Sequence, residues 1–325
     1  MNKLDVIKLP VEKELKEFRE LFDTSLQSTT PLLNEVLGYV KKRNGKMMRP
    51  ILVMLMAKLF KGCVNDASLH AALSLELLHT ASLIHDDVVD DSDKRRGQSS
   101  VNALYDNKVS ILVGDYMLAT SLRHAAITRH LELVELVSRL GQDLSEGEII
   151  QLANTSNQDF SEDIYFNVIK KKTAALFAAS AESGAISVDA SPDEVALAAQ
   201  FGEMIGIAFQ IKDDIFDYFD NPEVGKPSGN DMLEGKLTLP ALYVLNAKAD
   251  ADMRALALRI RSLNATKEEI AQFVDYVKRE GGIEYAERVM MEYRNKVVSL
   301  LPSSIDPALA TALTAYIDYV VERNK

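Results

Sequence analysis

The chain has 325 residues, and its 37 Lys and Arg against 48 Asp and Glu give a formal net charge of −11 at pH 7. This charge argues against a nucleic-acid partner, because such binding is driven by clustered Lys and Arg that displace counterions from the phosphate backbone. Apolar residues make up 47% of the sequence, whereas Gly and Pro number only 15 and 9, so a helical protein with an extensive core is expected.

The N-terminal segment shows no apolar stretch of the kind that a signal peptide needs, and Cys63 is the only cysteine, so it has no disulfide partner within the chain. The longest apolar run, residues 51–60, is interrupted by Lys58 and is far shorter than the roughly 20 residues of a membrane span. These features predict a cytoplasmic protein without a transmembrane segment.

Apolar residues recur at three- and four-residue spacing along the chain, as at Leu73, Leu77 and Ile84, which predicts helices rather than strands. Helices are expected to begin near residues 192, 267 and 307, each after a Ser, Thr or Asp that can cap the first turn. The stretches 154–163 and 221–235 are rich in polar residues or in Gly and Pro and predict loops. Neither is long enough for a linker, so a single domain over residues 1–325 is expected.

Two acidic clusters share the spacing D-D-x-x-D within apolar helical sequence. They comprise Asp86, Asp87 and Asp90 in the first cluster, and Asp213, Asp214 and Asp217 in the second. Carboxylates four residues apart lie on one helix face and repel each other, and a bound cation reverses that repulsion. Oxygen ligands at this spacing suit Mg²⁺, which completes its shell with substrate phosphates. One such pair is usually a solvated helix face, but two clusters that can face each other across a cavity favour a metal site.

Basic residues accompany the acidic clusters. Lys46 and Arg49 lie in a Gly- and Pro-bearing segment before an apolar helical run, and Arg95 and Arg96 follow the first cluster. Lys offers a compact ammonium group, and Arg offers a planar fork that matches phosphate oxygens two at a time. His79 lies two helical turns before the first cluster, although a lone His there is more often a core residue. Local basic groups of this kind are what an anionic substrate needs against the negative charge of the whole chain.

Five segments, in this order and spacing, resemble the trans-isoprenyl diphosphate synthase (polyprenyl synthetase) family, most closely its octaprenyl diphosphate synthase type. They are GKMMRP (45–50), ELLHTASLIHDDVVDDSDKRRG (76–97), KKTAALF (171–177), FQIKDDIFDYFD (209–220) and GKPSGNDMLEGKLTLP (225–240). The resemblance covers most of the chain. It implies an all-α fold, a single-domain helical bundle around a deep central cavity, which usually forms a homodimer.

The resemblance also implies a role for each matched residue. The metal ligands would be Asp86, Asp90, Asp213 and Asp217, which would hold three Mg²⁺ ions with the help of Asp87 and Asp214. Isopentenyl diphosphate would be bound by Lys46, Arg49, His79 and Arg96. The allylic diphosphate would contact Arg95, Lys172, Lys226 and Lys236, and the reacting carbons would face Thr173 and Gln210.

The implied reaction is the sequential head-to-tail condensation of isopentenyl diphosphate onto farnesyl or geranylgeranyl diphosphate. Ala81 and Ser82 precede Asp86 by about one helical turn, and their small side chains predict an open pocket for the growing chain. We therefore expect a medium to long product, about octaprenyl, for a quinone side chain. Small residues at this spacing can instead serve only the close packing of two helices.

Other functions stay open at this point. A farnesyl or geranylgeranyl diphosphate synthase would make a shorter product by the same chemistry. A terpene cyclase or a head-to-head synthase would not need the separate basic site of Lys46, Arg49 and Arg96, and a non-catalytic regulatory subunit commonly lacks aspartates that are complete here. The sequence leaves open whether a hydrophobic product is released by peripheral contact with a membrane.

Overall fold

The computed structural model describes residues 2–42, 45–95, 97–154, 159–219 and 228–323. Over these residues the chain is helical, and its only strands are β1 (Lys94–Arg95) and β2 (Gln98–Ser99). The strands pair antiparallel, with Lys94 opposite Ser99. The fold is therefore all-α, as the sequence predicts.

The chain forms two compact units. Unit 1 comprises Met1–Gln142, Leu176–Gly202 and Leu300–Tyr316, and unit 2 comprises Asp143–Ala175, Glu203–Ser299 and Ile317–Lys325. The expectation of a single domain stays a prediction. No helix among the described residues is long and apolar enough to cross a bilayer.

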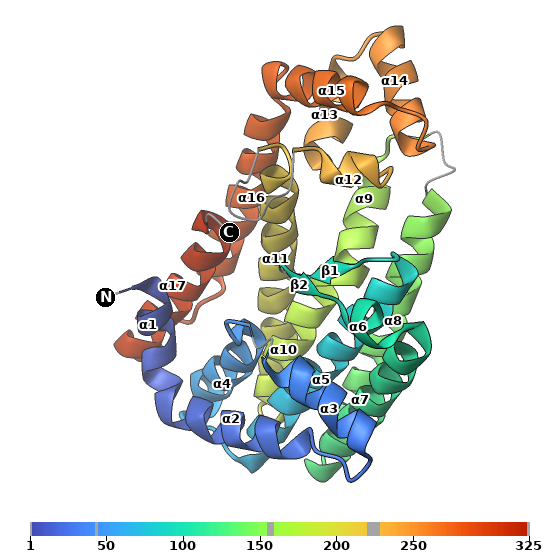
Figure 1. The fold of residues 1–325 in the computed structure, drawn as a ribbon. Coiled ribbons are helices and arrows are strands. Elements are labelled where there is room, and N and C mark those ends of the chain that lie inside the picture. The colour runs from blue at the N-terminus through green and yellow to red at the C-terminus, as the bar shows by residue number, and fades with distance from the viewer. Residues whose placement is uncertain (1, 43–44, 96, 155–158, 220–227, 324–325) are drawn as a thin grey trace. The chain divides into compact units, whose positions relative to one another are not determined.

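The N-terminal part of unit 1 is a series of helices (Figure 1). They are α1 (Lys3–Lys8), the 3₁₀ turn η1 (Leu9–Val11), α2 (Glu12–Ser25), α3 (Pro31–Lys42), α4 (Met48–Lys61), α5 (Asp66–Val89), α6 (Val101–Tyr105) and α7 (Asn107–Ile127). Later helices that contribute residues to this unit are α8 (Leu131–Asn154), α10 (Ala175–Ile186), α11 (Pro192–Phe216) and α17 (Pro307–Glu322).

The packing of α5 against α7 is the most extensive helix contact in unit 1. Small and polar side chains allow it: the Ser74 hydroxyl donates to the Ser121 carbonyl oxygen at 2.8 Å, and the Ser121 hydroxyl donates to the Ser74 carbonyl oxygen at 2.7 Å. At the other end of the contact, a Cβ on Gly114 would lie 2.2 Å from Nε2 of His85. Gly114 therefore leaves room for the His85 ring in this position, and a larger side chain there would displace the ring.

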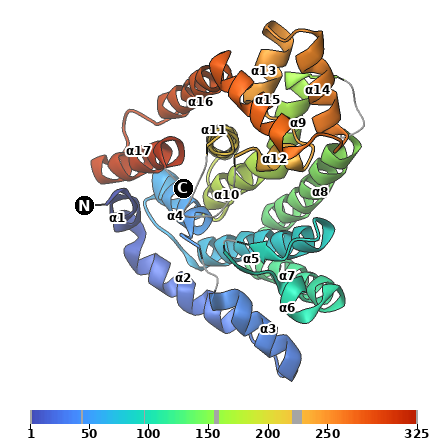
Figure 2. The same cartoon turned by 45° about the horizontal axis from the view of Figure 1, so that its top comes forward.

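Unit 2 contains α9 (Glu162–Ile169), the π-helical turn η2 (Lys170–Ala174), α12 (Asn230–Leu233), α13 (Leu239–Ala247), α14 (Ala251–Arg261), α15 (Lys267–Arg279) and α16 (Gly282–Ser299). The C-terminal half of α11 also belongs to it. Figure 2 shows α13, α14 and α15 gathered at one end of this unit. There α13 packs on α16, with the rings of Tyr243 and Tyr285 stacked at a centroid distance of 4.1 Å.

The helix starts at residues 192, 267 and 307 are confirmed, since α11, α15 and α17 begin there. Thr266 forms a complete capping box with Glu269, and the Asp306 carboxylate accepts two backbone N–H bonds of 3.0 Å. The expected loop at 221–235 is wrong for residues 230–233, which form α12. Residues 220–227 and 155–158 lie outside the described part of the chain.

Candidate active site

The first acidic cluster lies at the C-terminal end of α5, where the helix dipole and the last carbonyl groups add negative potential. Asp86 is half-buried and Asp90, which ends the helix, is exposed. The backbone N–H of Asp90 donates to the Asp86 carbonyl oxygen at 2.8 Å, so the two residues are one helical turn apart. Their carboxylates supply the oxygen ligands that a hard divalent cation prefers.

Asp87, between these two residues, has a different environment. Its side chain is only 2% exposed, and Nε of Arg95 on β1 donates to its Oδ1 at 2.6 Å. A buried carboxylate needs such a partner because the interior solvates a charge poorly. Arg95, predicted to contact the allylic diphosphate, is 29% exposed and is held in place by this pair.

The residues predicted to bind isopentenyl diphosphate lie in unit 1. Arg49 is in the first turn of α4, and Lys46 is exposed just before this helix. The Arg49 guanidinium lies 5.6 Å from the centre of the Phe177 ring. His79 is half-buried on α5. Arg96, the fourth residue of this set, lies outside the described residues.

The residues predicted to set the product length lie on α5. Ala81 is fully buried and lies on the same helix face as Ser74 and His85, which contact α7. Ser82 is half-buried, and its hydroxyl donates to the His79 carbonyl oxygen at 2.9 Å. Ala81 therefore has the position that close helix packing requires, and its role in chain length stays a prediction.

Each aspartate of the second cluster has a protein partner in unit 2. Nη2 of Arg323 donates to Oδ1 of Asp213 at 2.7 Å, and its guanidinium lies 3.6 Å from the centre of the Phe209 ring. The Asp217 carboxylate accepts the backbone N–H groups of Asn230 at 3.0 Å and Asp231 at 3.1 Å, which are the first residues of α12.

Asp214 is the most buried member of this cluster, at 3% exposure. The Tyr165 hydroxyl donates to its Oδ2 at 2.5 Å, and Nε2 of Gln210 donates to its Oδ1 at 2.8 Å. Burial raises the pKa of Asp214 well above its usual range, and the negative charge of Asp231 raises it further. Burial and the Asp214 carboxylate likewise raise the pKa of Tyr165, which stays a hydrogen-bond donor.

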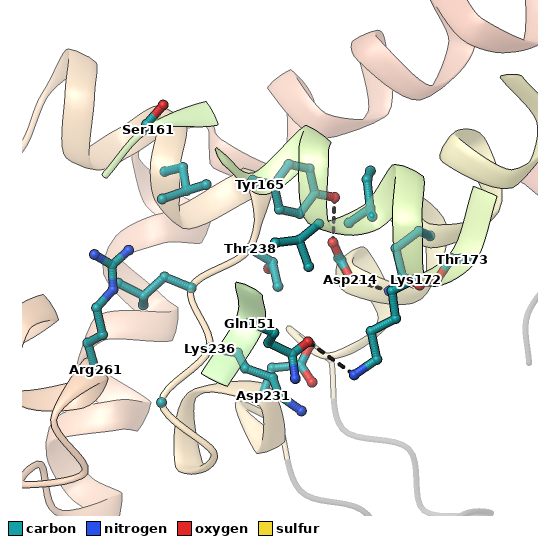
Figure 3. A pocket seen from close by; sticks show the side chains of 16 residues that line it. Gln151, Ser161, Tyr165, Lys172, Thr173, Asp214, Asp231, Lys236, Thr238 and Arg261 are labelled. Atoms are coloured by element: carbon teal, nitrogen blue, oxygen red, sulfur yellow. Dashed lines mark hydrogen bonds between the residues drawn. The ribbon is translucent and has the colours of Figure 1, made fainter. Parts of the chain in front are cut away.

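A cavity of about 210 Å³ opens beside Asp214 within unit 2 (Figure 3). Five residues that the sequence predicts for the site line it: Lys172, Thr173, Gln210, Asp214 and Lys236. Other polar residues of the lining were missed by sequence reasoning: Gln151, Ser161, Tyr165, Asp231, Thr238 and Arg261. The cavity therefore gathers part of the predicted site from η2, α11 and the segment between α12 and α13.

The π-helical turn η2 presents Lys172 and Thr173 to this cavity. Lys172 pairs with Glu148 on α8, and its Nζ donates to Oε1 of Gln151 at 3.2 Å. Close approach of η2 to α8 depends on Gly147, where a Cβ would lie 3.2 Å from the Lys172 backbone nitrogen. Such wide turns inside α-helices occur often at functional sites.

Lys236 and Lys226 are also predicted from the sequence to contact the allylic diphosphate. The ammonium group of Lys236 donates to the Glu234 carboxylate and lies at the cavity. Lys226 lies outside the described residues.

Among the described residues no group of three or more His, Cys, Asp or Glu side chains is assembled to hold a metal ion. Mg²⁺ in proteins often takes only one or two carboxylates and completes its shell with water and substrate phosphates.

Comparison with known proteins gives consistent matches. Residues 30–277 match the family model for polyprenyl synthetase. The octaprenyl diphosphate synthase of Escherichia coli (strain K12) is 32% identical over 301 residues, which are 92% of this chain and 93% of that protein.

Two solved structures match nearly the whole chain. A geranylgeranyl pyrophosphate synthase from Bacteroides thetaiotaomicron is 53% identical with a TM-score of 0.87, covering 99% of this chain and 100% of that one. A decaprenyl diphosphate synthase from Rhodobacter capsulatus is 34% identical with a TM-score of 0.92, covering 99% of each chain. The same all-α fold is thus present in relatives whose names give different product lengths.

Proposed function

Because the chain belongs to the polyprenyl synthetase family and is a prenyltransferase, we propose that it makes an all-trans-polyprenyl diphosphate. It adds isopentenyl diphosphate head to tail, in successive steps, to farnesyl or geranylgeranyl diphosphate. The observation that carries this proposal is the cavity of unit 2, because Lys172, Thr173, Gln210 and Lys236 all line it and all are assigned to the allylic substrate by their motifs.

Asp86 and Asp90 of the first cluster, and Asp213 and Asp217 of the second, hold Mg²⁺, with three ions when diphosphate is bound. Bound Mg²⁺ stabilises the negative charge that develops on the departing diphosphate. To bind Mg²⁺, the Asp213 carboxylate gives up its ion pair with Arg323. Asp217 can cap α12 and bind a cation at once, because each carboxylate oxygen has a second lone pair.

Existing ion pairs support the assignment of the basic residues. Lys172 pairs with Glu148, Lys236 with Glu234, and Arg95 with Asp87.

These carboxylates hold the Lys and Arg side chains in position until the allylic diphosphate binds. The diphosphate carries a higher negative charge and replaces the carboxylates as the partner of these side chains. Lys226 joins this set. Isopentenyl diphosphate is bound by Lys46, Arg49, His79 and Arg96, and Arg49 lies in the first turn of α4.

In the reaction the allylic C–O bond breaks, and the electron pair leaves with diphosphate. The oxygens of Thr173 and Gln210 stabilise the resulting allylic cation by their dipoles, without the covalent trapping that a strong nucleophile would cause. The double bond of isopentenyl diphosphate, held close by its own basic site, then forms the new C–C bond. A proton is lost to the released diphosphate, and the alkene is restored.

Labelled isopentenyl diphosphate with farnesyl or geranylgeranyl diphosphate tests this proposal. We expect chain extension with Mg²⁺ present and none after chelation, and activity should return when Mg²⁺ is added back. Cyclic products, or a product made without consuming isopentenyl diphosphate, would instead identify a cyclase or a head-to-head synthase. A chain that is inactive alone but stimulates another synthase would be the regulatory subunit.

For product length we propose a medium to long chain, about octaprenyl, destined for a quinone side chain. The support is the small size of Ala81 and Ser82, one turn before Asp86. A geranylgeranyl product is the second candidate, favoured by the name of the relative from Bacteroides thetaiotaomicron. Mass spectrometry of the products decides between them. Ala81→Phe should shorten the product, and an unchanged distribution in a folded variant would remove Ala81 from this role.

We also propose that the protein is a homodimer. Its support is the number of exposed apolar side chains on α7, where Ile111 is 44%, Leu112 67%, Leu122 44% and Ile127 42% exposed. Large exposed apolar groups gathered on one helix commonly mark a contact between proteins. Light scattering should give twice the 36.0 kDa chain mass, and Leu112→Lys should shift the mass toward one chain.

A further inference from the structure

Four side chains at the cavity of unit 2 form one continuous chain of hydrogen bonds. The Tyr165 hydroxyl donates to Oδ2 of Asp214 at 2.5 Å, and Nε2 of Gln210 donates to Oδ1 of Asp214 at 2.8 Å. The Thr173 hydroxyl then donates to Oε1 of Gln210 at 2.6 Å. All four residues line the cavity, and Figure 3 shows the Tyr165 hydroxyl directed at the Asp214 carboxylate.

The chain of bonds has a direction. Both oxygens of Asp214 accept hydrogen bonds, one from the Tyr165 hydroxyl and one from Gln210, so the NH₂ group of Gln210 faces Asp214. The amide oxygen of Gln210 is thereby turned to Thr173, whose hydroxyl hydrogen is committed to that oxygen. The lone pairs of the Thr173 hydroxyl are then left for the cavity.

Tyr165 is placed so that it can maintain the orientation of this hydrogen-bond chain. It is 8% exposed, and its ring is fixed edge-on against Phe166 at a centroid distance of 5.3 Å. Its helix, α9, continues directly into η2, which carries Thr173, so both ends of the hydrogen-bond chain belong to one segment. Gln210 and Asp214 are one turn apart on α11 and complete the connection.

We propose that Tyr165 is a positioning residue for the ionisation step. By donating to Asp214, it keeps the carboxylate oriented so that Gln210 stays aligned and Thr173 presents oxygen lone pairs, not its proton, to the allylic carbon. Oxygen dipoles aimed at a developing positive charge lower the barrier most when they are fixed beforehand. The inference rests on the proposed function, because it assigns the positive charge to the allylic carbon beside Thr173.

The Tyr165→Phe variant tests the proposal, since it removes the hydroxyl and keeps the ring. We expect kcat to fall roughly tenfold, as for one lost hydrogen bond, while KM for isopentenyl diphosphate is unchanged. Tyr285→Phe is the matched control, because the Tyr285 hydroxyl donates to Oε2 of Glu162 at 2.7 Å on the same helix α9. This control should retain wild-type kcat.

A double-mutant cycle with Thr173→Val separates positioning from simple structural support. If Tyr165 acts through Thr173, Tyr165→Phe has no further effect on kcat once the Thr173 hydroxyl is gone. In the Thr173→Ser background, which keeps the hydroxyl, the tenfold effect should return.

Equal effects of Tyr165→Phe in the wild-type and Thr173→Val backgrounds would overturn the proposal, as would a wild-type kcat for Tyr165→Phe itself. Circular dichroism and thermal melting confirm that each variant is folded before its kcat is compared. A wild-type protein that extends no allylic diphosphate would refute the proposed function instead, so the two failures are distinguishable.

Discussion

The two acidic clusters share one spacing and differ in their surroundings. In the first cluster the middle residue, Asp87, is buried against Arg95, whereas Asp90 is exposed at the end of α5. In the second cluster Asp213 pairs with Arg323 and Asp217 caps α12.

The difference shows that the D-D-x-x-D motif defines which carboxylates are present, but not which protein groups those carboxylates contact in the absence of substrate. The surrounding fold decides that. A cation that binds the second cluster as we propose would compete with Arg323 for Asp213 and would share Asp217 with backbone N–H groups. The first cluster presents Asp90 to solvent directly.

The largest expected effect comes from Asp86→Ala. We expect kcat/KM to fall by about a thousandfold or more, because the variant removes a proposed metal ligand at the developing charge. The melting temperature should hardly change, because Asp86 is only half-buried at a helix end. Steady-state kinetics and calorimetry on the same samples measure both. A variant within tenfold of wild type would break the comparison by removing the first cluster from catalysis.

Acid should weaken the scaffold of the first cluster. On α5 and α7, Nδ1 of His70 and Nδ1 of His124 lie 2.8 Å apart, so one ring must be a neutral acceptor. Burial lowers the pKa of His124 to about 4, and the positive charges of His70 and Arg123 add to this shift.

Since the pKa of His124 is lower in the folded state than in the unfolded state, stability is complete above the unfolded value and is lost as pH falls toward about 4. The loss is on the order of 3 kcal/mol. Urea unfolding between pH 7 and pH 4 measures it, and His124→Gln should flatten the profile. An equally steep profile in that variant would place the acid sensitivity elsewhere.

Two variants of Asp217 distinguish its structural role, the capping of α12, from its proposed role in catalysis. Asp217→Ala should cost about 1 kcal/mol of unfolding free energy, because α12 loses its cap, and should also reduce activity. Asp217→Asn keeps one of the two accepting oxygens, so it should lose less stability than Asp217→Ala while activity falls. If the two variants lose stability equally, capping is not what Asp217 contributes.

Arg323→Gln should have the smallest effect. Without the guanidinium, Asp213 has one competitor fewer, so the Mg²⁺ concentration for half-maximal activity should fall about fivefold, which corresponds to ~1 kcal/mol. A Mg²⁺ titration at saturating substrate measures it. Arg294→Gln, which breaks an ion pair with Asp318, is the control and should leave the titration unchanged.

What the sequence predicts well is local. The caps at Ser191, Thr266 and Asp306 involve neighbours three residues away, so the starts of α11, α15 and α17 can be read directly. Lys172 and Gln210 are predicted for the site because they lie in motifs whose order and spacing are specific, and both line the cavity of unit 2.

What the sequence misses depends on contacts between distant residues. Asp213 and Arg323 are 110 positions apart, and no pattern near the C-terminus indicates their pairing. The helix α12 was missed because its cap comes from Asp217, well before it in the chain. Tyr165 lies seven positions before Lys172, but the intervening π-helical turn breaks the helical periodicity that would relate them.

The π-helical turn makes the site sensitive to chain length as well as to residue identity. Its wider loop accommodates one residue more than an ordinary turn does. Deleting a single residue there would let the segment close into regular helix, in which adjacent side chains point about 100° apart. Lys172 and Thr173 could then no longer reach Gln151 and Gln210 together. Deletion of Lys170, the residue of this turn that precedes the motif at 171–177, can thus silence this enzyme while every motif residue remains in its sequence.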